Sequence, residues 1–308
     1  MLVPGAKICV THLVRAVNGA APFLNFARSY HKWNPGIEHE LVLALKGFSK
    51  PADVKPWLAT ANLNCRYLYL PNEGCDLSTY RAVATTLLCE VCVFLNSFST
   101  LQETNWLQHL VRPLLDDARV GVTGATGSYE SLRASFSSIP ETKHYRFLSG
   151  LRQRLYQHRH RHLWKPFPPF PNPHLRTNGF AIRRRDWLNL TPGPLNDKCG
   201  GWKLESGRAS MTRQMLQQGL QVLVVDKYGR TYPPPEWCGS RTFRSGNQSQ
   251  LLLADNQTRQ FATANRQQQE VLTKIAWGHS TTCQELAHHA TKQVRAQIDP
   301  FPCAGVQG

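Results

Sequence analysis

Short apolar runs recur along the first 130 residues of the chain, and segments with helical periodicity separate them. The clearest run is V-C-V-F-L at residues 91–95, which is typical of a strand buried on both faces at the centre of a parallel sheet. Further runs predict strands at residues 7–14, 40–45, 66–70 and 118–126. Apolar spacing between them predicts helices at residues 22–33, from Pro51, and at 77–88. This alternation favours an α/β protein with a mostly parallel sheet and right-handed crossovers.

The central run stops abruptly in the polar turn N-S-F-S at residues 96–99. Thr100 and Glu103 have the spacing of a capping box, which predicts that a helix opens there and ends at Pro113. The turn would then lie at the carboxyl edge of a central strand and beside a helix N-terminus, where open α/β sheets bind ligands and phosphates. A turn without chemistry remains the alternative, because every strand-to-helix unit needs one.

The second half of the chain begins with a basic segment, residues 146–165, that carries leucines at helical spacing and His158, His160 and His162. Residues two apart on a helix face different ways, so a solvated basic face is favoured over a metal site. The proline-rich run at 166–173 lacks most amide donors and predicts a rigid surface connection.

After this connection we expect a strand at 180–182, a helix opened by residues 205–208 and ended by Gly219, and a strand at 220–225. The tail from about Thr258 is Gln-rich and predicted to be helical. The expected organisation is therefore a main domain over residues 1–240, with halves at about 1–130 and 131–240, and a helical extension over 241–308.

The composition of the chain excludes some classes of function but does not identify one. The formal net charge of +16 favours anionic partners without choosing between them, and aromatic-basic signatures of nucleic-acid binding are missing, which disfavours nucleic acid. The sequence has no run of about 18 apolar residues and no signal-peptide pattern, so we expect a cytoplasmic protein without a transmembrane segment. Phosphate-loop, dinucleotide and G-x-S-x-G fingerprints do not occur.

Cysteine usage points to free thiols. The chain has nine cysteines, an odd number, and several fall in predicted strands, which fits buried thiols better than disulfides. Cys89 and Cys92 have redox or zinc spacing, but no second pair accompanies them, so a metal or redox role is disfavoured.

With these segments laid out, the chain resembles the nucleotide-sugar glycosyltransferases of the GT-A fold, in particular the family-2-like group. The resemblance covers about residues 7–232 and rests on the order of five segments, which read K-I-C-V-T-H-L-V-R-A-V-N-G, C-D-L-S-T-Y-R-A-V-A-T, V-F-L-N-S-F-S, H-L-R-T-N-G-F-A-I-R-R-R-D-W and L-E-S-G-R-A-S-M-T-R-Q-M-L-Q-Q-G-L-Q-V-L-V-V. It implies a Rossmann-like, mostly parallel sheet flanked by helices. It also implies transfer of a hexose-like sugar, as in polysaccharide biosynthesis, from a nucleotide-sugar donor to a glycan, lipid-linked or small-molecule acceptor.

The resemblance also assigns candidate site residues. Glu205 matches the catalytic carboxylate region and is our candidate base, the alternative being that it only caps a helix. Asn178 and Arg208 fall on the acceptor side. The expected contacts to the nucleotide sugar are Thr11, His12, Leu13, Arg15, Lys46, Asp76, Arg81, Asn96, Ser97 and Ser99.

One departure from the family bears on metal binding. Where the family has Asp-x-Asp, this chain has Asn96-Ser97-Phe98-Ser99, and neutral oxygens hold Mg²⁺ or Mn²⁺ weakly. Three interpretations stay open: other groups hold the metal, basic side chains neutralise the leaving diphosphate, or activity has been lost. The last leads to the competing hypothesis, a noncatalytic GT-A-like protein that binds an anionic glycan or nucleic acid.

Overall fold

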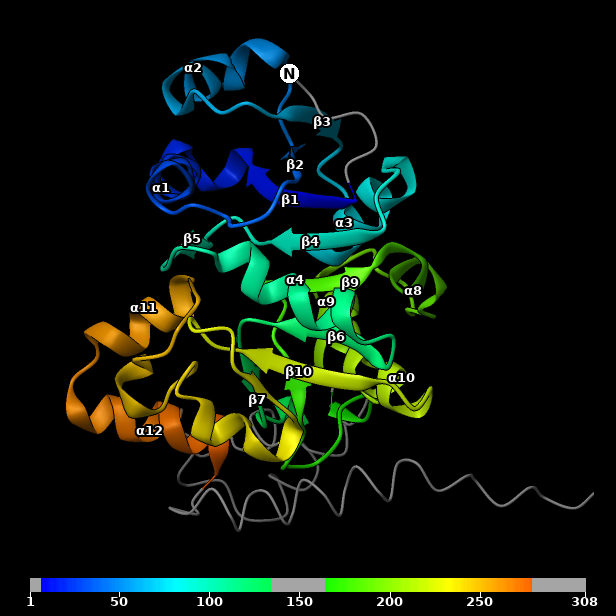
Figure 1. Cartoon of the computed structure of the whole chain (residues 1–308), viewed down its shortest axis with the longest axis vertical. Coiled ribbons are helices and arrows are strands. Elements are labelled where there is room, and N and C mark those ends of the chain that lie inside the picture. The colour runs from blue at the N-terminus through cyan, green and yellow to red at the C-terminus, as the bar shows by residue number, and fades with distance from the viewer. Residues whose placement is uncertain (1–6, 134–163, 279–308) are drawn as a thin grey trace, which may run out of the picture.

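The computed structural model describes residues 7–133 and 164–278 (Figure 1). Its centre is an eight-stranded sheet in the order β11-β10-β6-β9-β4-β1-β2-β3. The strands are β1 (Ile8–Arg15), β2 (Glu40–Lys46), β3 (Arg66–Leu70), β4 (Val91–Leu95), β6 (Val120–Gly124), β9 (Gly179–Arg183), β10 (Gln221–Val225) and β11 (Thr231–Tyr232). Neighbouring strands pair in parallel except where β9 meets β4 and β6 and where β11 meets β10. The expected mixed α/β fold with a mostly parallel sheet is confirmed.

Helices cover both faces of this sheet. They are α1 (Ala20–Lys32), α2 (Pro51–Ala61), α3 (Asp76–Thr86), α4 (Trp106–Asp116), α8 (Arg184–Asn189), α9 (Lys198–Ser206), α10 (Met211–Gln217), α11 (Asn256–Thr263) and α12 (Arg266–Trp277), with 3₁₀ turns η1 (Ala16–Asn18), η2 (Pro234–Ser240) and η3 (Gly246–Gln248). One core layer packs α1, α2 and α4 on the sheet, and the other packs α3, α8, α9 and α10. Strand β4 feeds Val93 into the first layer and Phe94 into the second, which explains its unbroken apolar run.

Strand order places a crevice at the carboxyl edge of the sheet. The chain moves outward from β1 to β2 and β3 and then returns to β4 on the other side of β1, so the order reverses between β1 and β4. Because β9 is antiparallel, with Gly179 opposite Leu95, its amino end lies at the same edge. The residues just before β9 therefore meet the carboxyl ends of β1 and β4.

Two element boundaries differ from expectation. Helix α4 begins at Trp106 after Asn105, a left-handed residue, while Thr100–Leu101 forms a short strand β5 that pairs with β12 (Leu253–Ala254). The predicted capping box is therefore wrong, and α4 does not begin directly after the polar turn. Pro113 does not stop the helix, which loses one backbone donor there and continues to Asp116.

The second difference concerns Glu205. It lies in the last turn of α9, and α10 starts separately after Ser210, whose Oγ accepts a hydrogen bond from the Arg213 backbone N–H. The alternative that Glu205 caps a helix N-terminus is therefore wrong.

The helical tail is confirmed within the described residues, where α11 and α12 follow one another. Trp277 is buried at the end of α12, and its Nε1 donates to the Phe243 carbonyl at 2.8 Å. A short antiparallel pair is formed by β7 (Gly127–Ser128) and β8 (His174–Leu175). Tyr129 directly follows β7, and its backbone N–H donates to the Ala276 carbonyl at 2.9 Å. The two helices thus pack on the body of the protein, and the division at residue 240 stays a prediction.

Several expectations fall outside the described residues. These are most of the basic segment 146–165 with its three histidines, and Cys283 and Cys303. Among the described cysteines, free thiols occur at Cys9, Cys65, Cys75, Cys89, Cys92 and Cys199. None of the described helices is long and apolar enough to cross a membrane.

Candidate active site

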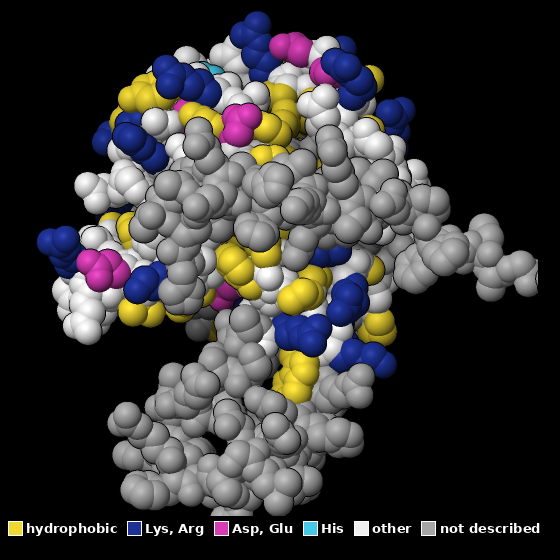
Figure 2. Space-filling model, turned by 90° about the horizontal axis from the view of Figure 1, so that it is seen from below, with side chains coloured by type: hydrophobic (Ala, Val, Ile, Leu, Met, Phe, Trp, Pro, Cys, Tyr) yellow, Lys and Arg dark blue, Asp and Glu magenta, His cyan; other side chains and the backbone are white. Residues whose placement is uncertain are grey.

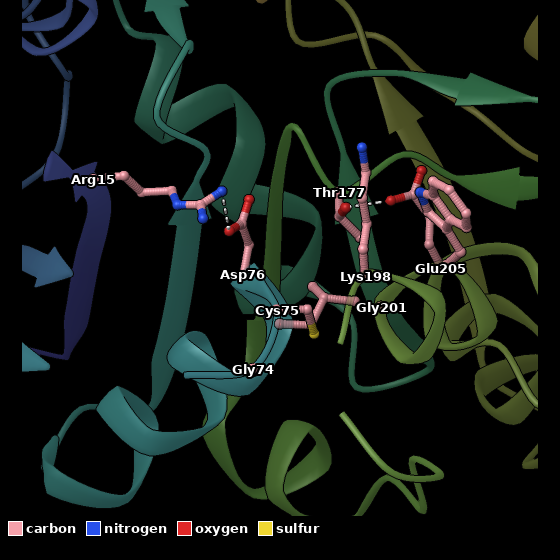
Figure 3. Close-up of a pocket in the computed structure, with 10 residues that line it drawn as sticks. Arg15, Gly74, Cys75, Asp76, Thr177, Lys198, Gly201 and Glu205 are labelled. Carbon is pink, nitrogen blue, oxygen red and sulfur yellow. Dashed lines mark hydrogen bonds and ion pairs between the residues drawn. The ribbon is translucent and has the colours of Figure 1, made fainter. Parts of the chain in front are cut away.

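A cavity of about 280 Å³ opens at the carboxyl edge of the sheet, where the strand order reverses (Figure 3). Arg15, the last residue of β1, reaches it from one side. Helix α9 forms the opposite wall. The cavity is lined by Arg15, Gly74, Cys75, Asp76, Leu77, Thr177, Lys198, Gly201, Trp202 and Glu205. We call it the first cavity.

The loop before α3 forms the floor of the first cavity, and glycine allows its course. Gly74 has a left-handed φ of 64°, and a Cβ there would lie 2.4 Å from Ser78 Oγ. The next residue, Cys75, donates its backbone N–H to the Leu195 carbonyl at 3.1 Å, which ties this loop to the segment before α9. A backbone hydrogen bond therefore ties the floor of the cavity to the segment that leads into the wall formed by α9.

Arg15 and Asp76 form a loose ion pair in the first cavity. Arg15 Nη1 lies 3.6 Å from Asp76 Oδ1, with 32% and 39% of the two side chains exposed (Figure 3). Pairs this exposed contribute at most about 1 kcal/mol. An entering anion can therefore recruit the Arg15 guanidinium at little cost in folding stability.

Glu205 faces the first cavity from the last turn of α9. Thr177 Oγ1 donates a hydrogen bond to Glu205 Oε2 (Figure 3). Burial raises the pKa of Glu205, while the hydrogen bond from Thr177 and the charge of Arg176 oppose the rise. A carboxylate with a raised pKa and a fixed orientation is suited to accepting a proton in a reaction.

A second cavity of about 320 Å³ shares Glu205 and Trp202 with the first. We call it the second cavity; its lining is Glu130, Leu132, His174, Arg176, Trp202, Glu205, Ser206, Arg244, Gln257 and Gln260. Glu205 thus stands at the junction of two cavities. Burial lowers the pKa of His174 to about 4, so this ring is neutral at pH 7.

The structure brings Arg15, Asp76 and Glu205, expected from the sequence, together around the first cavity. Thr11, His12 and Leu13, by contrast, are fully buried within β1. The His12 ring stacks on Phe26 with ring centroids 3.7 Å apart, and burial lowers its pKa to about 3. These three side chains belong to the core and do not line either cavity.

Lys46 and Arg81 serve the walls of the site from outside it. Lys46 is buried, and its Nζ donates to the carbonyls of Gly74 and Cys75 and to Thr79 Oγ1 at 3.0–3.1 Å. It therefore holds the floor loop. Arg81 donates to three carbonyls at the C-terminal end of α8, those of Trp187, Leu188 and Leu190. Neither residue lines the first or second cavity, and direct contact of either with a ligand stays a prediction.

The polar side chains of the turn after β4 form hydrogen bonds within the turn. Asn96 Oδ1 accepts hydrogen bonds from the Phe98 backbone N–H at 2.9 Å and from Ser99 Oγ at 3.0 Å. Ser99 Oγ is also 2.6 Å from the Asn178 carbonyl. Ser97 is buried, and none of the turn lines the two cavities.

The two expected acceptor-side residues also lie outside both linings. Asn178 is buried, and its Oδ1 accepts a hydrogen bond from Thr126 Oγ1 at 2.6 Å. Arg208 Nε donates to the Lys165 carbonyl at 3.1 Å. Direct contacts of these residues with an acceptor stay a prediction.

Several lining residues were not found by sequence reasoning. Thr177 lies in the recognised H-L-R-T-N-G segment and could have been included, and Lys198 and Trp202 lie on a helix whose glycines obscured it. Lys198 Nζ lies 5.2 Å from the Trp202 ring centroid. Nothing in the local sequence pointed to Arg244.

The described side chains do not form a set of ligands that could hold a metal ion. Among residues 7–133 and 164–278, no group of three or more His, Cys, Asp or Glu side chains could hold a metal ion. The first cavity offers the carboxylates of Asp76 and Glu205, and the former is paired with Arg15. A hard cation takes six or more oxygen ligands, so these residues do not fit a metal centre built by the chain itself.

Cys89 and Cys92 lie away from both cavities, with their sulfurs 3.6 Å apart. Cys9 lies beside Cys92 on the neighbouring strand β1, and its thiol donates to Glu40 Oε2 at 3.3 Å. These cysteines do not belong to any group of three His, Cys, Asp or Glu side chains that could hold a metal among the described residues.

Comparison with known proteins gives a structural likeness only. No family model matches the sequence, and no curated protein matches it. A mannosyltransferase from Pyrobaculum calidifontis, solved with GDP-Man and Mn²⁺, is 12% identical, with 97% of this chain and 78% of that chain covered and a TM-score of 0.46. Glucosyl-3-phosphoglycerate synthase from Mycobacterium tuberculosis, solved with UDP and Mn²⁺, is 14% identical, with 59% and 58% covered and a TM-score of 0.36. The chain thus spans less than two thirds of the synthase, and the likeness extends to general architecture alone.

Proposed function

We propose that the protein is a glycosyltransferase that moves a sugar from a nucleotide-sugar donor to a hydroxyl of a glycan, lipid-linked or small-molecule acceptor. The observation that carries the proposal is Glu205, a carboxylate of raised pKa that lines two adjoining cavities. Transfer between two substrates needs two sites that meet at the reacting atoms, with a proton acceptor between them. The arrangement around Glu205 has this form.

The first cavity is proposed to hold the donor. It lies at the switch point of the sheet, and it presents the cations of Arg15 and Lys198. Sugar transfer leaves a nucleoside diphosphate, whose developing negative charge must be stabilised. Arg15 and Lys198 would supply that stabilisation, with Arg15 released from its loose pair with Asp76.

Glu205 is proposed to take the proton of the acceptor hydroxyl. The hydrogen bond from Thr177 fixes the orientation of its carboxylate. The raised pKa brings its basicity closer to what a general base needs near neutral pH. In this mechanism the deprotonated oxygen attacks the anomeric carbon, and the bond to the diphosphate breaks.

A divalent metal is proposed to matter less here than in proteins with an Asp-x-Asp loop. If a metal enters, Asp76 is the first carboxylate positioned to hold it, beside the diphosphate. The metal would neutralise charge on the leaving group. All other steps above rest on side chains of the chain itself.

A second candidate function is a noncatalytic protein that binds an anionic glycan or nucleic acid. The carboxylate-free turn and the net charge of +16 favour it. Figure 2 shows Lys and Arg side chains in several separate groups, with few Asp or Glu, on one face of the described molecule. Separate groups fit a short anion better than a continuous nucleic-acid track.

Binding of nucleotide sugars separates the two candidates and tests the donor cavity. We expect one nucleotide sugar of a panel to raise the melting temperature, because a ligand of the folded state stabilises it by mass action. Arg15→Gln should weaken that ligand about tenfold or more, whereas Arg28→Gln, an exposed change on α1, should not. Failure of every nucleotide sugar to bind, or equal binding by Arg15→Gln, would overturn the donor assignment. Binding without turnover on any acceptor would favour the second candidate.

A further inference from the structure

Arg244 in the second cavity is a buried cation with too few partners. Only 6% of the residue is exposed. Its Nη2 donates to Gln257 Oε1 at 3.2 Å, its Nη1 lies 3.6 Å from Glu130 Oε2, and its Nε is buried without an acceptor among the described residues. A guanidinium has five N–H donors, and burying one costs free energy unless they are paired.

Arg176 in the same cavity is paired more closely than Arg244. Its Nη2 donates to Asp255 Oδ2 at 2.8 Å, and that carboxylate is 1% exposed. Its Nη1 donates to Thr126 Oγ1 at 3.3 Å. Arg244 instead faces Glu130, whose side chain is 26% exposed and lies beyond hydrogen-bond distance. The positive charge of Arg176 is therefore paired with the buried carboxylate of Asp255, whereas Arg244 has only the more distant carboxylate of Glu130.

The backbone of Arg244 is fixed in an unusual conformation. Its φ of 46° is left-handed, which non-glycine residues rarely adopt. Two side chains hold it there: Gln248 Oε1 accepts the Arg244 backbone N–H at 3.1 Å, and Thr273 Oγ1 donates to its carbonyl at 2.9 Å. The side chain thus leaves a rigid backbone and lines the second cavity.

The remaining groups of the second cavity do not supply the missing anion. Burial lowers the pKa of His174 to about 4, which leaves the ring neutral at pH 7. Glu205 accepts the hydrogen bond from Thr177, and no ion pair joins it to Arg244 among the described residues. Asp255 is engaged by Arg176, so a loosely placed Glu130 is the main counter-charge that Arg244 has.

We propose that the second cavity binds the anionic group of a substrate, a carboxylate or a phosphate, through the guanidinium of Arg244. The planar fork suits a bidentate oxyanion. Trp202 and Glu205, at the junction with the first cavity, then face the rest of that molecule. Resting on the proposed function, this makes the acceptor an anionic hydroxy compound, and the hydroxyl next to Glu205 is the one that reacts.

Anion binding can be measured without any transfer assay. The probes are inorganic phosphate and acetate, titrated by calorimetry and thermal shift against the parent and against Arg244→Gln, Arg244→Lys, Arg241→Gln and Arg15→Gln. Arg241 is the matched control, because it is exposed, lies on the same segment and also has a left-handed φ, of 53°. Phosphate without acetate binding would identify a phosphate site, and binding of both a general oxyanion site.

We expect Arg244→Gln to weaken the bound anion tenfold or more, Arg244→Lys to weaken it less, and Arg241→Gln to bind as the parent does. Glu130→Gln removes the competing carboxylate and should tighten anion binding several-fold. This variant keeps the test decisive if Arg244→Gln does not fold. The proposal would be overturned if neither anion bound, or if a folded Arg244→Gln protein bound the anion as the parent does. It would also be overturned if Arg15→Gln alone lost anion binding, or if Glu130→Gln left anion binding unchanged. Nucleotide-sugar binding is measured separately, so failure of one assignment does not imply failure of the other.

Discussion

Thr177 donates a hydrogen bond to Glu205 across the gap between the segment before β9 and the last turn of α9. The contact joins two parts of the chain that the antiparallel direction of β9 brings to the carboxyl edge of the sheet. It also fixes Glu205, the carboxylate that the linings of the first and second cavities share. The chemical role of Glu205 therefore depends on the topology of the sheet as much as on its own residue type.

The first prediction concerns transfer by the Glu205→Gln variant. Gln keeps the size and still accepts the hydrogen bond from Thr177, but it cannot take a proton. We expect turnover with a matched donor and acceptor to fall by about 10²–10⁴-fold, with donor affinity nearly unchanged. Glu236→Gln, an exposed change in η2, is the control and should turn over as the parent does. Turnover of Glu205→Gln within about threefold of the parent would remove the residue from the mechanism.

The second prediction is a pH dependence of stability that isolates Glu205. Its pKa is raised in the folded protein from the ordinary value of 4.5, chiefly by burial, so the folded state keeps a proton that the unfolded state releases. The resulting stabilisation is fully present below the unfolded pKa and is lost as pH rises through the folded pKa. We therefore expect the stability of the parent relative to Glu205→Gln to fall with rising pH from about 4.5 and then to level off.

Denaturant melts of the two proteins at matched pH values measure this difference. Contributions from other groups cancel because the proteins differ at one position. A difference that instead grows with pH would mean that Thr177 and Arg176 hold the carboxylate ionised, with a lowered pKa. Glu205 would then be a weaker base than the mechanism requires.

The sheet was readable from the sequence because its strands carry local signals. Val91–Leu95 is apolar at every position since both faces of β4 are covered, and its bounds were predicted correctly. The start of α4 was missed for a tertiary reason: Thr100 pairs with Ala254 on β12, far along the chain. Helix α9 was missed because Gly200 and Gly201 weaken its pattern, each by about 1 kcal/mol relative to Ala.

The site could be predicted in part for similar reasons. Arg15 and Asp76 end a strand and begin a helix, and such positions can be placed at the sheet edge from sequence alone. The burial of Lys46 could not be foreseen, because its three acceptors come from a loop and a helix that only the fold brings there. Arg244 joins the second cavity through contacts from η3 and α12, which no local pattern encodes.

The third prediction concerns Lys46 as an anchor of the first cavity. Lys46→Met keeps the length of the side chain but removes one donor each from the Gly74 carbonyl, the Cys75 carbonyl and Thr79 Oγ1. We expect a loss of about 2–4 kcal/mol in the free energy of unfolding, because unpaired buried polar groups are costly. Donor affinity should fall as well, since the freed loop carries Gly74 and Cys75. Lys55→Met, an exposed change on α2, is the control and should alter neither quantity.

Chemical denaturation and nucleotide titration of the same Lys46→Met preparation test both parts. A loss of stability without any loss of donor affinity would mean that the contacts of Lys46 stabilise the fold but do not affect donor binding in the first cavity. Donor affinity lost at unchanged stability would instead return Lys46 to the direct ligand contacts. Thr79→Val, which removes one of the three acceptors, should cost only about 1 kcal/mol.

The last prediction is that chelation of divalent metal slows transfer by less than about tenfold. A hard cation needs several oxygen ligands, preferably charged. Asn96 Oδ1 and Ser99 Oγ already satisfy each other and their neighbours in the turn after β4, and Asp76 is paired with Arg15. We expect calorimetric titration with a nucleoside diphosphate to give similar affinities with EDTA and with Mn²⁺, because Arg15 and Lys198 carry the charge stabilisation. If activity instead vanished with EDTA and returned with Mn²⁺, Asp76→Asn would be the decisive variant: loss of the Mn²⁺ response there would make Asp76 the metal ligand and leave Arg15 as its partner in charge balance.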